Sequence, residues 1–338
     1  MNLPLTPYPL PLDFVAIGDT TVDEFIRLKE ARISCDINRE NCTISMRWGA
    51  KIPYDSSVLV PAVGNAANAA VAAARLGLSA GFLSNVGKDR FGEDILATLA
   101  REGVDTRYIA VNDGIPTNHH YVLTYDAERT ILIRHEAYPY RLPKDLPPPP
   151  WLYLSSLGEY SEAFHEELAK WLIAHQETKL AFQPGTFQIK MGKEKLQALY
   201  ARAEIVACNK EEAESILGVG KTDMLTLLKE MRALGPKIAL ITDGQNGAYA
   251  SDGTQMLKVP MYPDPKPPEN RTGAGDAMTA TFVVMLAQGK TLAEALRAGP
   301  VNSMSVVQYT GAQKGLLTSD ALEKYLAEAP ADYLVTPL

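Results

Sequence analysis

The chain has 338 residues, of which 46% are hydrophobic and 22% charged, and its formal net charge is −7. This composition is typical of a folded globular protein, and the length suits one large α/β domain or two modest ones. The acidic balance argues against nucleic acid or an anionic membrane as the main partner.

The three cysteines, Cys35, Cys42 and Cys208, are too few for a disulfide framework in a chain of this length. Structural zinc would require four ligands, which Cys35 and Cys42 do not supply alone. The N-terminal stretch MNLPLTPYPLPLD has no basic segment and is interrupted by prolines, so we expect no signal peptide. No apolar run is long enough to cross a membrane. We therefore expect a protein of the reducing cytoplasm.

The first elements alternate between strand and helix. Residues 14–17 form an apolar run typical of a buried strand. The alanine-rich segment that begins at Gly64 predicts a helix that ends near Gly77, because alanine has the highest helix propensity. AGFLSNVG then predicts a buried strand, and DRFGEDILATLAREG an amphipathic helix that Gly103 ends.

Two separated segments interrupt this rhythm with β-type patterns. Residues 25–60 are polar and are expected to be extended, and residues 118–134 predict two strands joined around 126–129. If the pieces near 25–60 and 112–135 meet as one sheet, they form a lid over the carboxyl ends of the main strands, where open α/β sheets bind ligands.

The second half returns to strands that alternate with helices of crossover length. Strands are expected at 151–155, 180–182, 205–208 and 238–242, and QNG at 245–247 predicts a tight hairpin into antiparallel last strands. The fold class that follows is α/β, with a mainly parallel sheet between helices on both faces. We expect a single domain over residues 1–338.

The stretch ENRTGAGDAMTATF, residues 269–282, places one acid in a run of small residues. The helix expected at 274–287 is apolar on all sides, so it is expected to be buried with Asp276 in its first turn. Asp276 could simply stabilise the helix dipole. However, Gly273, Ala274 and Gly275 leave their N–H groups accessible, and such a helix start is an anion site. A carboxylate beside a transferring phosphoryl group can take the proton of an attacking hydroxyl.

This stretch resembles the signature D-T-x-G-A-G-D of the ribokinase-like (PfkB) carbohydrate kinases. The resemblance implies a ribokinase-like three-layer α/β/α fold with a β-stranded lid, ATP as phosphoryl donor, and Asp276 as catalytic base beside an anion hole formed by the amides of residues 273–276.

Further segments resemble the family in the same order along the chain. The resemblance assigns one group of residues to the sugar pocket and a second to the nucleotide, and it places Glu212 near magnesium through water. The sugar group is Asp23, Gly64, Asn65 and Asn68, and the nucleotide group is Asn209, Thr242, Gly244, Gly247 and Asn302.

Three positions depart from the family pattern. Asn270 replaces the first acid of the signature, which leaves activation by a monovalent cation open. Arg271 replaces the usual threonine and could contact a phosphate or pair with Glu269. Val63 replaces the first glycine of a pair in the sugar segment.

The expected activity is ATP-dependent phosphorylation of a small sugar. A nucleoside acceptor is the alternative, which stacking by Tyr121, Tyr125 or Trp48 would favour, and a catalytically silent sugar-binding regulator is the third possibility. A phosphorylated acceptor would need a cation, which Arg47, Lys51, Arg129 or Arg134 could supply from the lid. The free edges of the lid sheet favour a homodimer.

Overall fold

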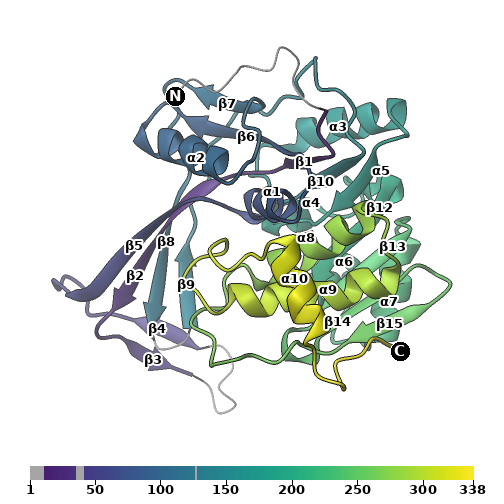
Figure 1. The fold of residues 1–338 in the computed structure, drawn as a ribbon. Helices are drawn as coiled ribbons and strands as arrows, with labels where there is room; N and C mark the ends of the chain where they lie inside the picture. Colours follow the sequence, from purple (N-terminus) through teal and green to yellow (C-terminus); the bar gives the residue numbers. More distant parts are fainter. Residues whose placement is uncertain (1–10, 36–41, 126–127) are drawn as a thin grey trace.

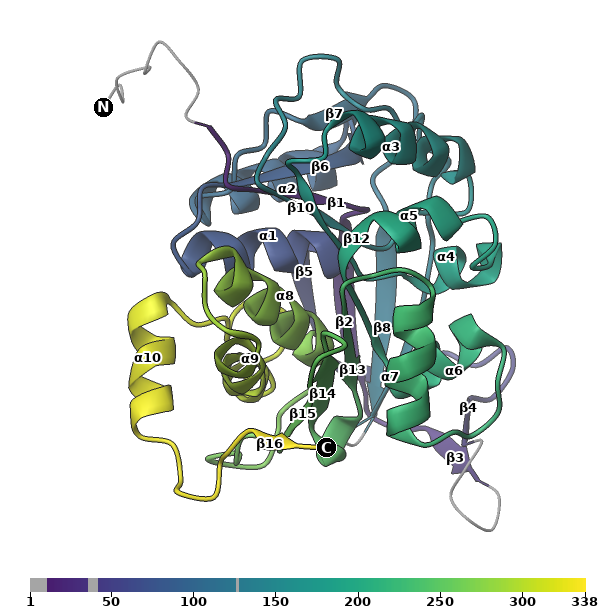
Figure 2. The same cartoon turned by 90° about the vertical axis from the view of Figure 1, so that its right-hand side faces the viewer.

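The computed structural model describes residues 11–35, 42–125 and 128–338. A large twisted sheet runs through the middle of the molecule with a helical layer on each face, and a smaller sheet projects from one side (Figures 1 and 2). The expected three-layer α/β/α class is therefore confirmed.

The large sheet is parallel over its greater part. β1 pairs with β10 on one side and with β6 on the other, and the parallel pairing continues from β10 through β11 and β12 to β13. The strands lie in the order β16 (Thr336–Pro337), β15 (Met256–Val259), β14 (Ala248–Ser251), β13 (Ile238–Thr242), β12 (Ala203–Asn209), β11 (Lys179–Phe182), β10 (Trp151–Leu154), β1 (Phe14–Ile17), β6 (Ala80–Gly87) and β7 (Ile109–Asn112).

The two helical layers bury separate apolar cores against the sheet (Figure 2). Within the described ranges, no helix combines the length and apolar character needed to span a bilayer. One layer contains α1 (Asn65–Arg75), α2 (Arg90–Arg101), α8 (Ala274–Ala287), α9 (Leu292–Val306) and α10 (Ser319–Ala327), and the other contains α3 (Glu162–Ala174), α4 (Thr186–Met191), α5 (Gln197–Arg202), α6 (Lys210–Leu217) and α7 (Met224–Ala233).

The sequence patterns placed most of these elements correctly. The expected strands at 14–17, 80–87 and 238–242 and the expected helix at 274–287 have the observed bounds. The QNG segment lies in a short 3₁₀ turn, Gly244–Asn246, followed by Gly247 at φ 91°, and β14 turns back antiparallel to β13 as expected.

The smaller sheet joins two distant parts of the chain, as the sequence suggested. Its strand order is β5-β2-β8-β9, and β2 pairs in parallel with β8. We call it the small sheet (Figure 1). Its strands are β2 (Thr21–Leu28), β5 (Tyr54–Val63), β8 (His119–Tyr125) and β9 (Glu128–Leu132).

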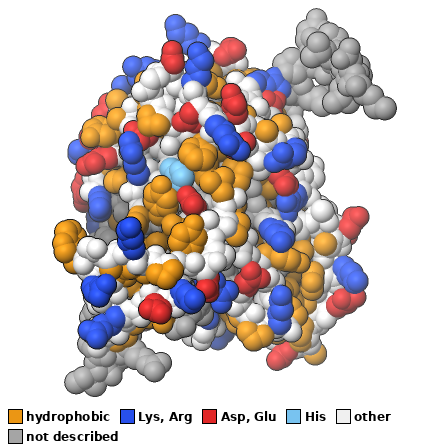
Figure 3. Space-filling model, turned by 90° about the vertical axis from the view of Figure 1, so that its left-hand side faces the viewer, with side chains coloured by type: hydrophobic (Ala, Val, Ile, Leu, Met, Phe, Trp, Pro, Cys, Tyr) orange, Lys and Arg blue, Asp and Glu red, His pale blue; other side chains and the backbone are white. Residues whose placement is uncertain are grey.

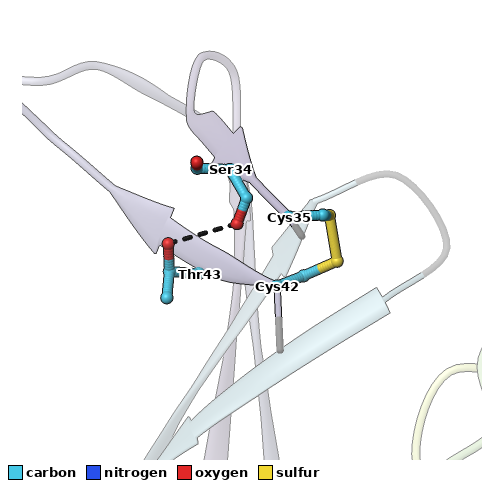
Figure 4. Close-up of a disulfide and its surroundings, with 4 residues drawn as sticks. All are labelled: Ser34, Cys35, Cys42 and Thr43. Atoms are coloured by element: carbon cyan, nitrogen blue, oxygen red, sulfur yellow. Dashed lines mark hydrogen bonds between the residues drawn. A yellow bond between two sulfur atoms is a disulfide. The ribbon is translucent and has the colours of Figure 1, made fainter. Parts of the chain in front are cut away.

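A short hairpin extends from the small sheet and carries a disulfide that the sequence analysis did not anticipate. Strands β3 (Arg32–Ser34) and β4 (Thr43–Ser45) pair antiparallel, with Ser34 opposite Thr43. This pairing brings the next two residues together, and Cys35 and Cys42 form a disulfide (Figure 4). The expectation of reduced cysteines is therefore wrong at this hairpin, because cross-strand neighbours need only local pairing to bond. Cys208 is a buried free thiol.

Candidate active site

Helix α8 begins without a side-chain cap. Gly273 is its N-cap residue, at φ 82°, and among the described residues no side chain caps the first turn by a hydrogen bond. A Cβ atom on Gly273 would lie 2.4 Å from the Cβ of Ala312, so only glycine fits there. The first N–H groups of α8 are therefore unpaired donors at the positive end of the helix dipole.

A cavity of about 300 Å³ opens on one side of this helix start. Ala274 and Gly275 line it, together with Thr242, Gly244 and Gly247 at the carboxyl end of β13. The rest of its lining is largely apolar and includes Met261, Met278 and Met304. We call it the methionine cavity.

A second cavity, of about 290 Å³, opens on the other side of the same helix start. Three carboxylates line it, those of Asp19, Asp23 and Asp276, and we call it the acidic cavity. Gly64, Asn65 and Asn68 at the start of α1 form one wall. A Cβ atom on Gly64, which has φ 119°, would lie 2.6 Å from the Asp19 carbonyl oxygen. Glycine is therefore needed to bring α1 this close to the end of β1.

The Asp276 carboxylate lies half-buried in the acidic cavity with one amide donor on each oxygen. Asn68 Nδ2 donates to Oδ2 at 2.8 Å, and Gln183 Nε2 donates to Oδ1 at 3.2 Å. Burial raises the pKa of the Asp276 carboxyl above its ordinary value, although these two hydrogen bonds act to lower it. A carboxylate with a raised pKa is better matched to proton transfer near neutral pH.

A second tier of residues fixes the direction of both amides. Gln313 Nε2 donates to Asn68 Oδ1 at 3.0 Å, so the Asn68 nitrogen points toward Asp276. The hydroxyl of the fully buried Tyr153 donates to Gln183 Oε1, which turns the Gln183 nitrogen toward Asp276. The carboxylate is held from two sides of the fold.

Two further acids in the acidic cavity face histidines. Asp19 Oδ2 lies 2.9 Å from His135 Nδ1, and Asp19 also accepts from the Tyr140 hydroxyl at 2.9 Å. Asp23 Oδ1 lies 3.4 Å from His120 Nδ1 but has no hydrogen-bond partner among the described residues, and His120 Nε2 also has none. Buried polar atoms without partners are costly, so these atoms are positioned for a polar ligand.

Most of the residues singled out from the sequence line one of these two cavities, whereas Gly273, Asn209, Glu212 and Asn302 do not. The side chain of Asn302 is fully buried, donates to Thr281 Oγ1 at 2.8 Å and accepts from the Leu317 N–H at 2.9 Å. The expectation that Asn302 lines an adenine pocket is therefore not met, because both ends of its amide bind protein. Its neighbours Ser303 and Met304 line the methionine cavity instead.

Asn209 and Glu212 form a reciprocal cap at the start of α6. Asn209 Oδ1 accepts from the Glu212 N–H, and Glu212 Oε2 accepts from the Asn209 N–H, both at 2.8 Å. Burial raises the pKa of the Glu212 carboxyl, the hydrogen bond from Asn209 lowers it, and the nearby charge of Asp276 raises it further. Glu212 therefore lies within electrostatic reach of Asp276.

The departures from the family pattern also have defined surroundings. Asn270 Oδ1 accepts from the Thr272 N–H at 2.6 Å. Glu269 accepts from the Thr310 hydroxyl at 2.5 Å, and in the described part of the chain it forms no ion pair with Arg271. Arg271 instead lines the methionine cavity. Val63 lines the acidic cavity, where the family has glycine.

Sequence reasoning missed several residues of the acidic cavity or its supports. Gln183 follows β11 in the segment FQPGTF, where no motif marks it. Asp19 lies four residues before Asp23, and only the fold shows that both acids face the same space. Lys190 and Phe187 come from α4, which was not identified as a wall of the site.

Comparison with known proteins agrees with this geometry. Residues 48–319 match the model of the pfkB family carbohydrate kinases. The chain belongs to this family. It is a phosphotransferase with an alcohol group as acceptor, and kinases of the ribokinase family use ATP.

Individual relatives include both sugar and nucleoside kinases. The chain is 29% identical to the ribokinase of Bacillus subtilis strain 168 over 78% of this chain and 87% of the relative. The structure of Arabidopsis thaliana ribokinase complexed with ribose and ATP superposes with a TM-score of 0.78 and 20% identity, covering 94% of this chain and 99% of that one. The Methanocaldococcus jannaschii nucleoside kinase superposes with a TM-score of 0.77 and 19% identity, covering 93% and 98%.

Proposed function

We propose that this PfkB kinase phosphorylates an unphosphorylated small sugar or related polyol. The acidic cavity takes the acceptor, and the methionine cavity takes ATP. The observation that carries this proposal is the position of Asp276 and the uncapped start of α8 between the two cavities. A donor phosphate and an acceptor hydroxyl can meet there beside the carboxylate.

In this mechanism Asp276 is the catalytic base. Its oxygens each accept one amide hydrogen bond and keep a lone pair for the acceptor hydroxyl. The carboxylate takes the hydroxyl proton while the alcohol oxygen forms its bond to the γ-phosphorus, and the bond from that phosphorus to the bridging oxygen of ADP breaks. The amides of residues 273–276 stabilise the charge on the transferred group.

Glu212 is the residue proposed to act near magnesium, through water. Among the described residues, no group of three or more His, Cys, Asp or Glu side chains is arranged to hold a metal ion. A single nearby carboxylate, that of Glu212, suits an Mg²⁺ ion that is bound mainly by phosphate oxygens and by water, with Glu212 orienting the water. When bound, the ion neutralises charge on the phosphates.

The charge of the acidic cavity supports an unphosphorylated acceptor. Three carboxylates face one lysine, Lys190, and two histidines, His120 and His135. Carboxylates hold polyols by accepting from their hydroxyls, whereas they would repel a phosphate group. None of the basic side chains considered for a phosphosugar, Arg47, Lys51, Arg129 and Arg134, lines this cavity.

The aromatic side chains considered for a nucleoside also lie elsewhere. Tyr121 and Tyr125 occupy alternate positions of β8 to those of His120, so they belong to the opposite face of the small sheet. Trp48 is 98% exposed. The acidic cavity therefore lacks the expected stacking residues, which favours a sugar.

The small sheet is proposed to act as the lid of a single ribokinase-like domain. Asp23, His120 and Ile131 extend from it into the acidic cavity, so it completes the acceptor site and excludes water. We expect the protein to work in the cytoplasm, where ATP is available. The disulfide of the hairpin does not contribute to this expectation, because disulfides are more typical of oxidising compartments.

Pairing of two chains through the small sheet is also proposed. Leu59, Tyr121 and Leu132 occupy one row on its outer face and are 43%, 44% and 53% exposed. Figure 3 shows hydrophobic side chains gathered in the middle of the face on that side of the molecule. Sedimentation velocity tests this: a concentration-independent monomer would contradict it.

A coupled assay of ADP release tests the proposed acceptor. The panel should contain neutral sugars, nucleosides and phosphosugars, with Asp276→Asn as the matched inactive control. We expect turnover with at least one neutral sugar. Turnover confined to nucleosides or phosphosugars would contradict the acceptor class, and ATP binding without any turnover would indicate a silent regulator.

A further inference from the structure

A third cavity, of about 440 Å³, lies at the outer end of the small sheet and faces the loop before α8. Phe25, Thr124 and Ser56 of the small sheet and Asn270 and Thr310 of the facing loops contribute to its walls. None of the residues proposed to act in the reaction lines this space. We call it the arginine cavity, because Arg27, Arg129 and Arg271 all line it.

Strand register explains how two of these arginines meet. Arg27 of β2 is opposite Thr124 of β8, and Thr124 is opposite Arg129 of β9. The two arginines thus lie in one row on one face of the sheet, with one strand between them. Adjacent strands are spaced about 4.8 Å apart, so the two backbones are about 10 Å apart and both guanidinium groups can reach one ligand.

The same face carries three successive rows with different chemistry. The row of Asp23 and His120 lines the acidic cavity, the row of Phe25 and Val122 is apolar and buried, and the row of Arg27 lines the arginine cavity. Asp23 and Arg27 are four positions apart along β2, which is about 13 Å. The apolar row therefore divides an anionic compartment from a cationic one.

The arginines of this cavity are only partly compensated: among the described residues Arg129 and Arg271 form no ion pair, and the charge of Arg271 reaches Asp264 of the methionine cavity at longer range. Glu269 is the acid that lines the cavity, and its Oε1 atom already accepts from the Thr310 hydroxyl. Asp55 lies 4.0 Å from Arg27, and both side chains are more than half exposed. Three like charges converge from two separate parts of the fold, which is unfavourable unless an anion joins them.

We propose that the arginine cavity binds the phosphate or carboxylate group of a small molecule. The anion is held by Arg27 and Arg129 from the small sheet and by Arg271 from the loop before α8. Arg271 also lines the methionine cavity, so the bound anion links the lid to the loop that leads into the anion hole. The source is either a free anion or a carboxylate at the far end of an extended, unphosphorylated acceptor.

Isothermal titration calorimetry with inorganic phosphate tests this site without any turnover. The titration is done at constant ionic strength with the ATP analogue AMP-PNP saturating, so that the start of α8 is occupied. We expect saturable binding at one site, weakened at least tenfold in the double variant Arg27→Gln/Arg129→Gln. Arg134→Gln is the matched control, because Arg134 is an exposed arginine that pairs with Glu136 at 2.7 Å.

Two outcomes would overturn the proposal: no saturable phosphate binding by the wild type, or equal affinity in the wild type and the double variant. Circular dichroism confirms that the double variant is folded, which is expected because both side chains are exposed. Repeating the titration with the active acceptor bound separates the two sources. Competition identifies the end of an extended acceptor, and unchanged binding identifies a separate anion. Neither result depends on which sugar is phosphorylated.

Discussion

The methionine cavity and the acidic cavity have nearly the same volume, about 300 and 290 Å³, but opposite chemistry. The first is lined mainly by apolar side chains and by the turn at the carboxyl end of β13, with Asp264 and Arg271 as its charged residues, all from the main body of the fold. The second contains three carboxylates, and part of its wall comes from the small sheet. Under the proposed assignment of ATP to the first cavity and the acceptor to the second, donor binding would depend mainly on shape and backbone, whereas acceptor binding would depend in part on side chains that the small sheet supplies.

The strongest test removes the carboxylate of Asp276, which lines the acidic cavity next in the chain to Ala274 and Gly275 of the methionine cavity. Asp276→Asn keeps the shape and both neighbouring amides but cannot take a proton, so kcat should fall by about 10²–10⁴-fold. Affinity for ATP, measured by calorimetry, should stay near that of the wild type. Near-normal kcat in the purified variant would refute the base assignment.

The next test changes the acidic cavity alone. Asp23→Asn removes the charge of a carboxylate oxygen that has no hydrogen-bond partner among the described residues. A hydrogen bond to a charged group contributes about 1.5–3 kcal/mol, so kcat/KM for the acceptor should fall about ten- to hundredfold. KM for ATP should be unchanged. An equal loss of kcat/KM for the acceptor and for ATP would show that the two cavities do not bind the two substrates independently.

The matching change in the methionine cavity is Gly275→Ala. A Cβ atom on Gly275 meets nothing within 4 Å, so the variant should fold normally. Its methyl group narrows the approach of phosphate to the first-turn amides, and kcat/KM for ATP should fall on the order of tenfold. Steady-state kinetics with the acceptor saturating measures this effect. Unchanged ATP kinetics would show that the phosphates do not approach this turn.

The smallest expected effect concerns the pKa of the Asp276 carboxyl. Gln183→Met removes a hydrogen bond that lowers the pKa of the Asp276 carboxyl, so that pKa should rise further. The base works deprotonated, so the acidic limb of the kcat profile should move to higher pH. The loss should be a few-fold below neutral pH and should shrink as pH rises.

A pH-independent loss in Gln183→Met would indicate a change in geometry rather than in proton affinity. Tyr153→Phe provides the control, because it leaves Gln183 in place but frees its amide to turn. Thermal unfolding of both variants separates these effects from a loss of stability, since a buried polar group without a partner costs about 1–3 kcal/mol.

The sequence predicted the elements and the centre of the site because their patterns are local. The apolar run after Gly273 determined the helix at 274–287, and the family motifs identified Asp23, Asn68 and Asp276. Asn302 was misplaced because the direction of a side chain on α9 depends on how α9 packs against α8. Gln183 and Gln313 were missed because their partners lie 93 and 245 residues away in the chain.

The disulfide between Cys35 and Cys42 was missed for a different reason. Composition argued against a framework of several bridges, but a single bridge needs only the pairing of β3 with β4. The three rows of the small sheet were also invisible in the sequence, since they depend on the parallel register between β2 and β8.

The residues that bind the Asp276 carboxylate, and those that orient them, all come from the main body of the molecule. Asn68 lies on α1, Gln183 after β11, Tyr153 on β10 and Gln313 in the loop between α9 and α10, so none belongs to the small sheet. The small sheet contacts this group through the backbone carbonyl of Ala62 in β5, which accepts from Gln313. The small-sheet residues that face the acceptor can therefore change during evolution while the residues that hold the Asp276 carboxylate stay the same. Exchanging strands β2, β5, β8 and β9 for those of a relative is a route to a new acceptor, provided that the exchange keeps the Ala62 carbonyl of β5, which accepts from Gln313 Nε2 at 2.6 Å.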